Sequence, residues 1–176
     1  FNGCDAALVS SRDTRIGIGS LLQLEGGTGR FLLSSNIMRD DAPVFLPWTI
    51  RTAGSRKIAV IGVSGENVLF DITDTMTSNV TLAPAMKSLE NAIRDLREKE
   101  KPDAVILLSG LTTEKNLKIM NSFPEISLCV SGGDNRGTVH GQPASRVILG
   151  DGRQILLADS RKGYFLAECS VSEQLT

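Results

Sequence analysis

Three runs of apolar residues, each long enough for a strand and too short for most helices, limit most strongly what this chain can fold into. They cover residues 57–63 (K-I-A-V-I-G-V), 104–108 (A-V-I-L-L) and 126–130 (I-S-L-C-V). Runs with little polar alternation are typical of strands that are covered on both faces of a sheet. The sequence therefore predicts three central strands of a layered fold.

The stretch between the first two runs has the periodicity of a helix. Within residues 82–100, apolar side chains recur at i, i+3 and i+4, namely at Leu82, Ala85, Met86, Leu89, Ala92, Ile93 and Leu96. Such a stripe predicts an amphipathic helix packed across the sheet, and Pro102 ends it. Strands that alternate with such a helix predict an α/β fold.

Shorter elements are expected on either side of this centre. Two further helices are expected, one at residues 17–24 before the glycine-rich stretch 26–29, and one from Thr112 or Thr113 to about Met120. Residues 48–52 and 57–63 form an expected hairpin. The other expected strands cover residues 6–9, 31–37, 146–149, 154–158 and 164–171, the last three as short antiparallel strands.

Length and composition favour one folded domain over residues 1–176. A chain of 176 residues and 18.9 kDa is long enough to bury ~70% of its unfolded surface. The net charge of -1 gives no electrostatic footprint for a nucleic acid. No apolar stretch approaches the ~20 residues of a membrane span. The chain starts at Phe1 without a signal-peptide pattern, which indicates a processed or partial polypeptide.

The three cysteines and one sequon leave alternatives open. Cys4, Cys129 and Cys169 lie far apart, each beside apolar residues, and form no C-x-x-C pair. We favour buried thiols, with a disulfide between two of them as the alternative. Residues 79–81 (N-V-T) fit an N-glycosylation acceptor, a triplet that also arises often by chance.

Three segments that follow expected strands share a further pattern. Residues 5–17 read D-A-A-L-V-S-S-R-D-T-R-I-G, residues 105–112 read V-I-L-L-S-G-L-T, and residues 131–136 read S-G-G-D-N-R. They resemble the metal-binding turns D-A-V-x-x-G-N-H-E-F-D-x-G, V-I-x-L-S-H-L-G and x-G-G-H-x-H of calcineurin-type metallophosphoesterases, specifically the 5′-nucleotidase branch. Residues 31–37 and 155–166 resemble two further segments of that family, F-x-x-L-S-A-N-I and P-I-V-Q-A-G-x-x-G-x-Y-L-G. The resemblance extends over nearly the whole chain.

This resemblance implies a layered metallophosphoesterase-like sheet sandwich with flanking helices. The first strand–helix–strand unit of the family, with its D-x-H and G-D motifs, would lie before Phe1, so the chain is either truncated or has a shortened sheet. The substrate-recognition domain of 5′-nucleotidases lies outside the similar region, so nothing here specifies a nucleotide. The resemblance also implies an extracytoplasmic or periplasmic location, with other domains of a larger polypeptide as partners.

The metal-binding side chains of the family are replaced in this chain. The degenerate site positions are Ser11, Arg12, Asp13, Gly110, Asp134 and Arg136. A two-metal phosphoesterase needs Asp, Asn and His ligands to orient a hydroxide and to neutralise developing charge. A guanidinium repels a divalent cation, and the one carboxylate of Asp134 does not make a dinuclear site. The family would imply two divalent metal ions, whereas this chain predicts no metal, no cofactor and no catalytic residue.

The two arginines allow two interpretations. If the turns converge as in the family, Arg12 and Arg136 with the N–H groups of Gly132 and Gly133 could hold a small anion. Alternatively, Asp134 or Asp13 neutralises one or both arginines. We favour the ion pair and expect Asp134 to contact Arg12 or Arg136, or a solvent anion to bridge the two guanidiniums.

Other candidate residues carry less chemistry. His140 is the single histidine, and no Ser or Cys can be assigned to it as a partner. Asp71 and Asp74 are better explained as turn and cap residues than as a cation site. The start of a dinucleotide loop at residues 17–19 (G-I-G) never completes G-x-G-x-x-G.

Three functions remain, from different classes. The first is a catalytically degenerate phosphoesterase domain that acts as a binding or scaffold module. The second is an active metal-dependent phosphoesterase completed by upstream residues. The third is a repurposed pocket that binds a small anion through Arg12 and Arg136. Fold alone does not choose among them.

Overall fold

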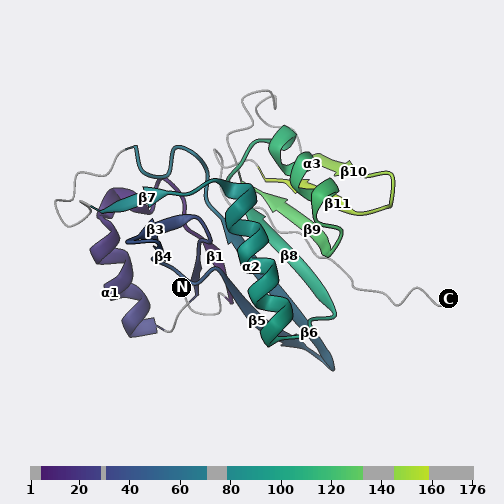
Figure 1. Cartoon of the computed structure of the whole chain (residues 1–176), viewed down its shortest axis with the longest axis horizontal. Helices are drawn as coiled ribbons and strands as arrows, with labels where there is room; N and C mark the ends of the chain where they lie inside the picture. Colours follow the sequence, from purple (N-terminus) through teal and green to yellow (C-terminus); the bar gives the residue numbers. More distant parts are fainter. Residues whose placement is uncertain (1–4, 29–30, 71–78, 133–144, 159–176) are drawn as a thin grey trace.

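A computed structural model describes residues 5–28, 31–70, 79–132 and 145–158 of the chain. Its largest element is a six-stranded sheet in the order β10-β11-β9-β8-β6-β5, drawn in Figure 1. The strands are β5 (Trp48–Ala53), β6 (Arg56–Val63), β8 (Ala104–Ser109), β9 (Ile126–Ser131), β10 (Ser145–Ile148) and β11 (Gln154–Leu157). The predicted central strands are confirmed, because β6, β8 and β9 lie side by side in the middle of this sheet.

The centre of the sheet is parallel and its two edges are antiparallel. The strands β6, β8, β9 and β11 pair in parallel, whereas β5 and β10 join the sheet as antiparallel hairpin partners of β6 and β11. The predicted hairpin is confirmed, with Gly54 in its turn at a positive φ of 60° that an L side chain rarely adopts. Parallel pairing brings the carboxyl ends of four strands to one edge, where a site can form.

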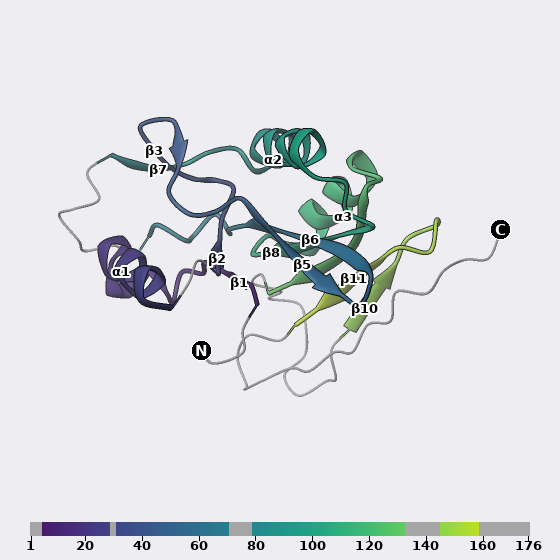
Figure 2. The ribbon, with the colours of Figure 1, turned by 90° about the horizontal axis from the view of Figure 1, so that it is seen from below.

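Helices α2 (Ala85–Lys99) and α3 (Thr113–Ser122) cover one face of the sheet, as Figure 2 shows. Leu89, Ile93 and Leu96 of α2 pack with Ile119 of α3 onto the face formed by alternate residues of the strands. Of the predicted stripe, Leu89, Ala92, Ile93 and Leu96 lie in the core, whereas Ala85 is half-buried and Met86 is exposed. Thr112 caps α3, with its side chain accepting a hydrogen bond from the backbone N–H of Lys115.

The opposite face of the sheet is less completely covered. Ile106 and Leu108 of β8, Leu128 and Val130 of β9 and Leu156 of β11 are half-buried, whereas their neighbours on the helix face are buried. In β6, by contrast, Val60 and Gly62 on this face are also buried, so the apolar character of both faces is matched by burial on both faces at β6 and by full burial of the helix face alone at β9 and β11.

A second layer holds the amino-terminal elements. It contains β1 (Ala7–Leu8), paired in parallel with β2 (Leu32–Leu33), the 3-10 helix η1 (Thr14–Ile16) and α1 (Ile18–Thr28). A three-stranded antiparallel sheet adds β3 (Ile37–Arg39), β4 (Ala42–Pro43) and β7 (Val80–Leu82). These elements surround their own core of Val9, Ile18, Leu21, Phe31, Leu32, Ile37, Phe45 and Val68.

Four expectations are corrected by the structure. Leu82 belongs to β7 and not to the long helix, because the chain is extended up to Pro84 and Ser88 is the first residue of α2 whose N–H bonds back, to Pro84. The glycines at 26 and 27 continue α1 instead of ending it. The expected strand at residues 31–37 is split, because Ser34, Ser35 and Asn36 bond to other segments. Residues 154–158 are antiparallel to β10 alone, since β11 pairs in parallel with β9.

Several expectations fall outside the described residues. They are the strand at residues 164–171, Cys4 and Cys169, Asp71 and Asp74, and His140. No helix in the described part of the chain is long and apolar enough to cross a bilayer.

Cys129 is a free, buried thiol in the middle of β9. Burial disfavours the thiolate and raises the pKa of this thiol to about 12. Because the thiolate is the nucleophile, we expect iodoacetamide at pH 8 to leave Cys129 unmodified in the folded protein and to alkylate it in guanidinium chloride. Mass-spectrometric mapping of the Cys129 peptide measures this. Equal modification of Cys129 in the two conditions would contradict the buried position of β9.

Candidate functional site

The carboxyl edge of the parallel strands is held together by backbone hydrogen bonds from one strand end to the next. The N–H of Gly110 donates to Val63 O (2.9 Å), the N–H of Gly132 to Ser109 O (2.9 Å), and the N–H of Ala158 to Ser131 O (2.8 Å). Three of the segments with family resemblance therefore end at one edge, those around Gly110, Gly132 and Ala158.

Ser64 connects the amino-terminal turn to this edge. Its hydroxyl lies 2.8 Å from Val9 O and 2.9 Å from the hydroxyl of Ser34. Asn36 completes the link, because its Oδ1 accepts from the N–H of Ser64 (2.8 Å) and its Nδ2 donates to Ser64 O (3.0 Å). All four groups are buried. Val9 is thus bonded to the residue that follows β6, and the turn at residues 10–13 begins directly after Val9.

Within that turn, Asp13 serves its own backbone. Its Oδ2 accepts from the N–H of Ser10 (2.8 Å) and from the Ser10 hydroxyl (2.6 Å). Asp and Ser side chains commonly close turns in this way. Arg12 is exposed, and no ion pair joins it to Asp13 in the described part of the chain. Of the two carboxylates that we expected near Arg12, Asp13 is therefore engaged with Ser10.

Gly110 occupies a space in which no side chain fits. A Cβ at this position would lie 2.6 Å from the backbone N of Gly65 and 3.2 Å from its Cα. In the reverse direction, a Cβ at Gly65 would lie 2.5 Å from Gly110 O. Real Cβ atoms almost never come so close to backbone, so a side chain at either position requires the two loops to move apart.

A buried polar network lies directly beneath this contact. The hydroxyl of Ser109 donates to Asn116 Oδ1 (2.6 Å), and Asn116 Nδ2 donates to Leu111 O (3.2 Å) and to Ser131 Oγ (2.9 Å). The N–H of Leu111 in turn donates to Ser109 Oγ (3.1 Å). Asn116, Ser109 and Ser131 are each fully buried. One helix side chain therefore ties the ends of β8 and β9 together.

The described residues offer no cluster of three or more His, Cys, Asp or Glu side chains that could hold a metal ion. Ser11 supplies only a neutral hydroxyl, Arg12 is a cation, and Gly110 has no side chain. The part of the site that the structure describes does not fit two divalent ions. Gly133, Asp134 and Arg136 lie outside the described residues, and so does the expected contact of Asp134 with an arginine.

Comparison of whole folds identifies the architecture. The calcineurin-like phosphoesterase YfkN of Bacillus subtilis superposes with a TM-score of 0.69 at 13% identity, over 87% of this chain and 53% of that one. The fold is that of a calcineurin-like metallophosphoesterase domain. The predicted α/β architecture and the resemblance to this family are both confirmed at the level of fold.

Two further solved structures also superpose on this chain. The 5′-nucleotidase precursor of Thermus thermophilus has a TM-score of 0.65 at 19% identity, over 87% of this chain and 32% of that one. The sulfate thiohydrolase SoxB of Thermus thermophilus has a TM-score of 0.68 at 23% identity, over 88% of this chain and 28% of that one. The chain thus spans about a third of the length of these two proteins. No protein-family model and no curated protein matches the sequence.

Three residues at the carboxyl edge of the sheet were not predicted from the sequence, namely Asn116, Gly65 and Ser64. Asn116 carried a usable signal, because it lies three and four residues before Ile119 and Met120, on the buried stripe of α3. A polar side chain at such a position predicts an internal hydrogen-bond network. Gly65 and Ser64 carried none, since their partners Gly110 and Val9 are distant in the chain.

Proposed function

We propose that this chain is a metallophosphoesterase-fold domain that binds a partner or ligand without hydrolysing phosphate esters. The observation that carries the proposal is the contact of Gly65 with Gly110. By resemblance, position 110 is where the family places a metal-binding histidine. Here a Cβ alone would overlap the Gly65 backbone at 2.6 Å, so the volume that a histidine needs is filled by main chain.

The chemistry of the neighbouring turn supports the same proposal. A dinuclear site requires several imidazole and carboxylate ligands within coordination distance of each ion. At the two positions where the family has Asn and His, this chain has Ser11 and the exposed Arg12. Asp13, the nearest carboxylate in the described turn, is held by Ser10. An arginine also cannot act as the general acid that the family's histidine supplies, because it does not release its proton near neutral pH.

The second candidate function is anion binding at the positions where the resembling family binds metal. Arg12 is exposed at the carboxyl edge, and Asp13 does not neutralise it. That observation favours a small anion held by Arg12 and, as an extension of the proposal, by Arg136, Gly132 and Gly133. Guanidinium groups and loop N–H groups together form anion sites. Hydrolysis completed by upstream residues is the competing alternative.

The proposal predicts that the purified chain holds no stoichiometric manganese, zinc, iron or calcium. It also predicts no chelator-sensitive hydrolysis of p-nitrophenyl phosphate above the buffer rate. Elemental analysis and a phosphatase assay with added Mn²⁺ measure these two quantities. The calcineurin-like phosphoesterase YfkN, prepared in parallel, controls for metal loss during purification.

The same measurements on the longest polypeptide that carries this chain separate the proposal from the active-enzyme alternative. Two metal ions per chain, with activity abolished by chelator, would refute the non-catalytic proposal. As a further control, the double variant Ser11→Asn with Arg12→His restores two ligand types of the family. It is expected to remain without bound metal, because the space at Gly110 stays closed.

A further inference from the structure

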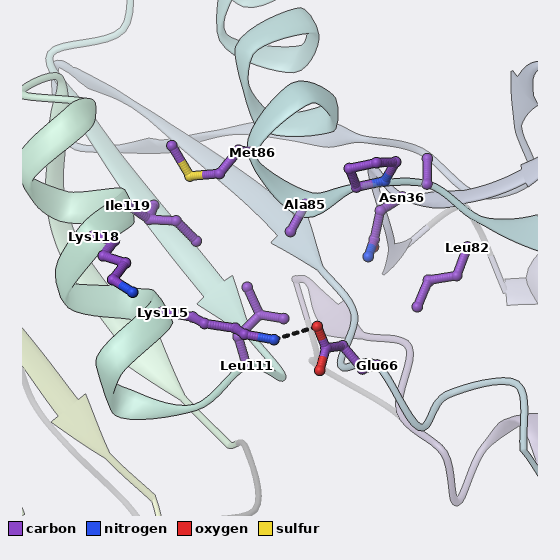
Figure 3. A pocket seen from close by; sticks show the side chains of 11 residues that line it. Asn36, Glu66, Leu82, Ala85, Met86, Leu111, Lys115, Lys118 and Ile119 are labelled. Carbon is purple, nitrogen blue, oxygen red and sulfur yellow. Dashed lines mark hydrogen bonds and ion pairs between the residues drawn. The ribbon is translucent and has the colours of Figure 1, made fainter.

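A cavity of about 440 Å³ opens between the start of α2, the start of α3 and the loop after β6 (Figure 3). It lies on the helix-covered face of the sheet beside the carboxyl edge, and its lining includes Leu111 from the turn after β8. Its size is at the lower end of the ~300–1,000 Å³ that small-molecule sites have in proteins. The cavity is therefore large enough for a small organic ligand.

The inner wall of the cavity is apolar. Leu111 and Ile119 are almost fully buried beneath it, and Leu82, Ala85 and Met86 form its sides. Met86 remains 42% exposed although it belongs to the amphipathic helix. A ligand that covers these side chains would gain the free energy of apolar burial.

Two lysines of the lining are each paired with a carboxylate. The charged residues of the lining are Lys115, Lys118 and Glu66. Lys115 pairs with Glu66, and Figure 3 shows this pair at the cavity. Lys118 Nζ lies 2.8 Å from Glu114 Oε1. These side chains are largely exposed, so their ion pairs are weak and can exchange partners at little cost.

Two further polar features face the same space. The first turn of α2 has no side-chain cap, so the N–H groups of Ala85, Met86 and Lys87 have no acceptor within the helix. These groups and the helix dipole favour a negative charge nearby. The amide of Asn36, which is 1% exposed, also lines the cavity and donates one of its two N–H groups to Ser64 O. In Figure 3 the nitrogen of this amide lies between Ala85 and Leu82.

We propose that this cavity binds a small amphipathic molecule with one carboxylate and an unbranched or flat apolar body. The apolar body lies against Leu111, Ile119 and Ala85. The carboxylate replaces Glu66 as the partner of Lys115, with Lys118 beside it. A cationic ligand would meet the two lysines and the positive end of the α2 dipole. The proposal is independent of the fate of the metal site.

Titration of the methyl-labelled chain with decanoate tests the proposal. We expect the largest chemical-shift changes at the methyl groups of Leu82, Met86, Leu111 and Ile119, while Ile61 in the centre of β6 is unchanged. Decanol and decylammonium are the matched probes of equal chain length. Decanoate is expected to bind at least about tenfold more tightly than decanol, since a charge-assisted contact adds about that much.

Variants locate the two halves of the site. In the double variant Lys115→Met with Lys118→Met, the affinity for decanoate is expected to fall to the affinity for decanol. Lys101→Met removes an exposed lysine away from the cavity and is expected to change nothing. Ala85→Leu narrows the cavity and is expected to weaken decanoate and decanol alike. Thermal unfolding verifies that each variant is folded.

Three outcomes would overturn the proposal. Equal binding of decanoate and decylammonium would show that the lysines do not select an anion. Shift changes centred outside the cavity lining would place the ligand elsewhere. Unchanged decanoate affinity in folded Lys115→Met with Lys118→Met would also refute it.

Discussion

Replacing Gly110 with alanine is expected to destabilise the protein by about 1–3 kcal/mol, the usual range for an extra carbon forced into a packed site. The new Cβ would meet the backbone N of Gly65 at 2.6 Å, and backbone cannot turn aside as a flexible side chain can. Gly110 is also bonded through its N–H to Val63 O at 2.9 Å, so displacing it strains the edge between β6 and β8. Urea denaturation of the two proteins measures the difference.

Gly26→Ala is the matched control. Gly26 lies within α1, and a Cβ there meets nothing within 4 Å. Alanine is the better helix former by up to about 1 kcal/mol, so this variant is expected to be neutral or stabilising. Gly110→Ala with wild-type stability would mean that the two loops move apart freely. That result would remove the main support for the non-catalytic proposal, because a histidine could then enter the same space.

Replacing Asn116 with alanine is expected to cost about 2–4 kcal/mol, because more than one buried polar group loses its partner. The hydroxyl of Ser109 would lose its acceptor at 2.6 Å and Ser131 Oγ would lose its donor at 2.9 Å, whereas Leu111 O would keep only the bond from the Ser131 hydroxyl at 3.3 Å. These groups are too deeply buried to find water in its place. We expect the largest loss of amide-exchange protection at the ends of β8 and β9.

Asn91→Ala on α2 controls for the change of side chain. Asn91 is exposed, and its Oδ1 accepts a hydrogen bond from Arg94 at 2.6 Å in solvent. Its replacement is expected to leave the free energy of unfolding unchanged within about 0.5 kcal/mol. If Asn116→Ala and Asn91→Ala had the same effect, the network beneath the strand ends would contribute nothing to stability.

The sequence predicted most of the central architecture because the relevant signals are local. The three apolar runs identified β6, β8 and β9, and the spacing of Leu89, Ile93 and Leu96 identified the buried face of α2. The predicted start of that helix was wrong, because Leu82 continues the apolar period of the helix but belongs to β7. Pairing of β7 with β3, a segment more than 40 residues earlier, decided that boundary.

The glycines also show that local signals are overruled by contacts between distant segments. The pair at 26 and 27 predicted a break, yet packing of Leu21 and Ile18 in the amino-terminal core keeps α1 helical through it. Glycine lowers helix propensity by only about 1 kcal/mol, which tertiary contacts easily offset. Gly110 was singled out as the position of a missing ligand, but no local pattern indicates that Gly65 fills the space.

Residue identity and spacing were enough to identify the buried face of α2 at Leu89, Ile93 and Leu96, and to show which ligand types of the resembling family are replaced at Ser11, Arg12 and Gly110. Tertiary structure alone decided that Gly65 and Gly110 touch, that Asn116 joins Ser109 to Ser131, and that a cavity opens between α2 and α3. The physical reason is that such contacts depend on the relative placement of loops distant in the chain. That placement is set by the packing of the whole domain, which local periodicity does not encode.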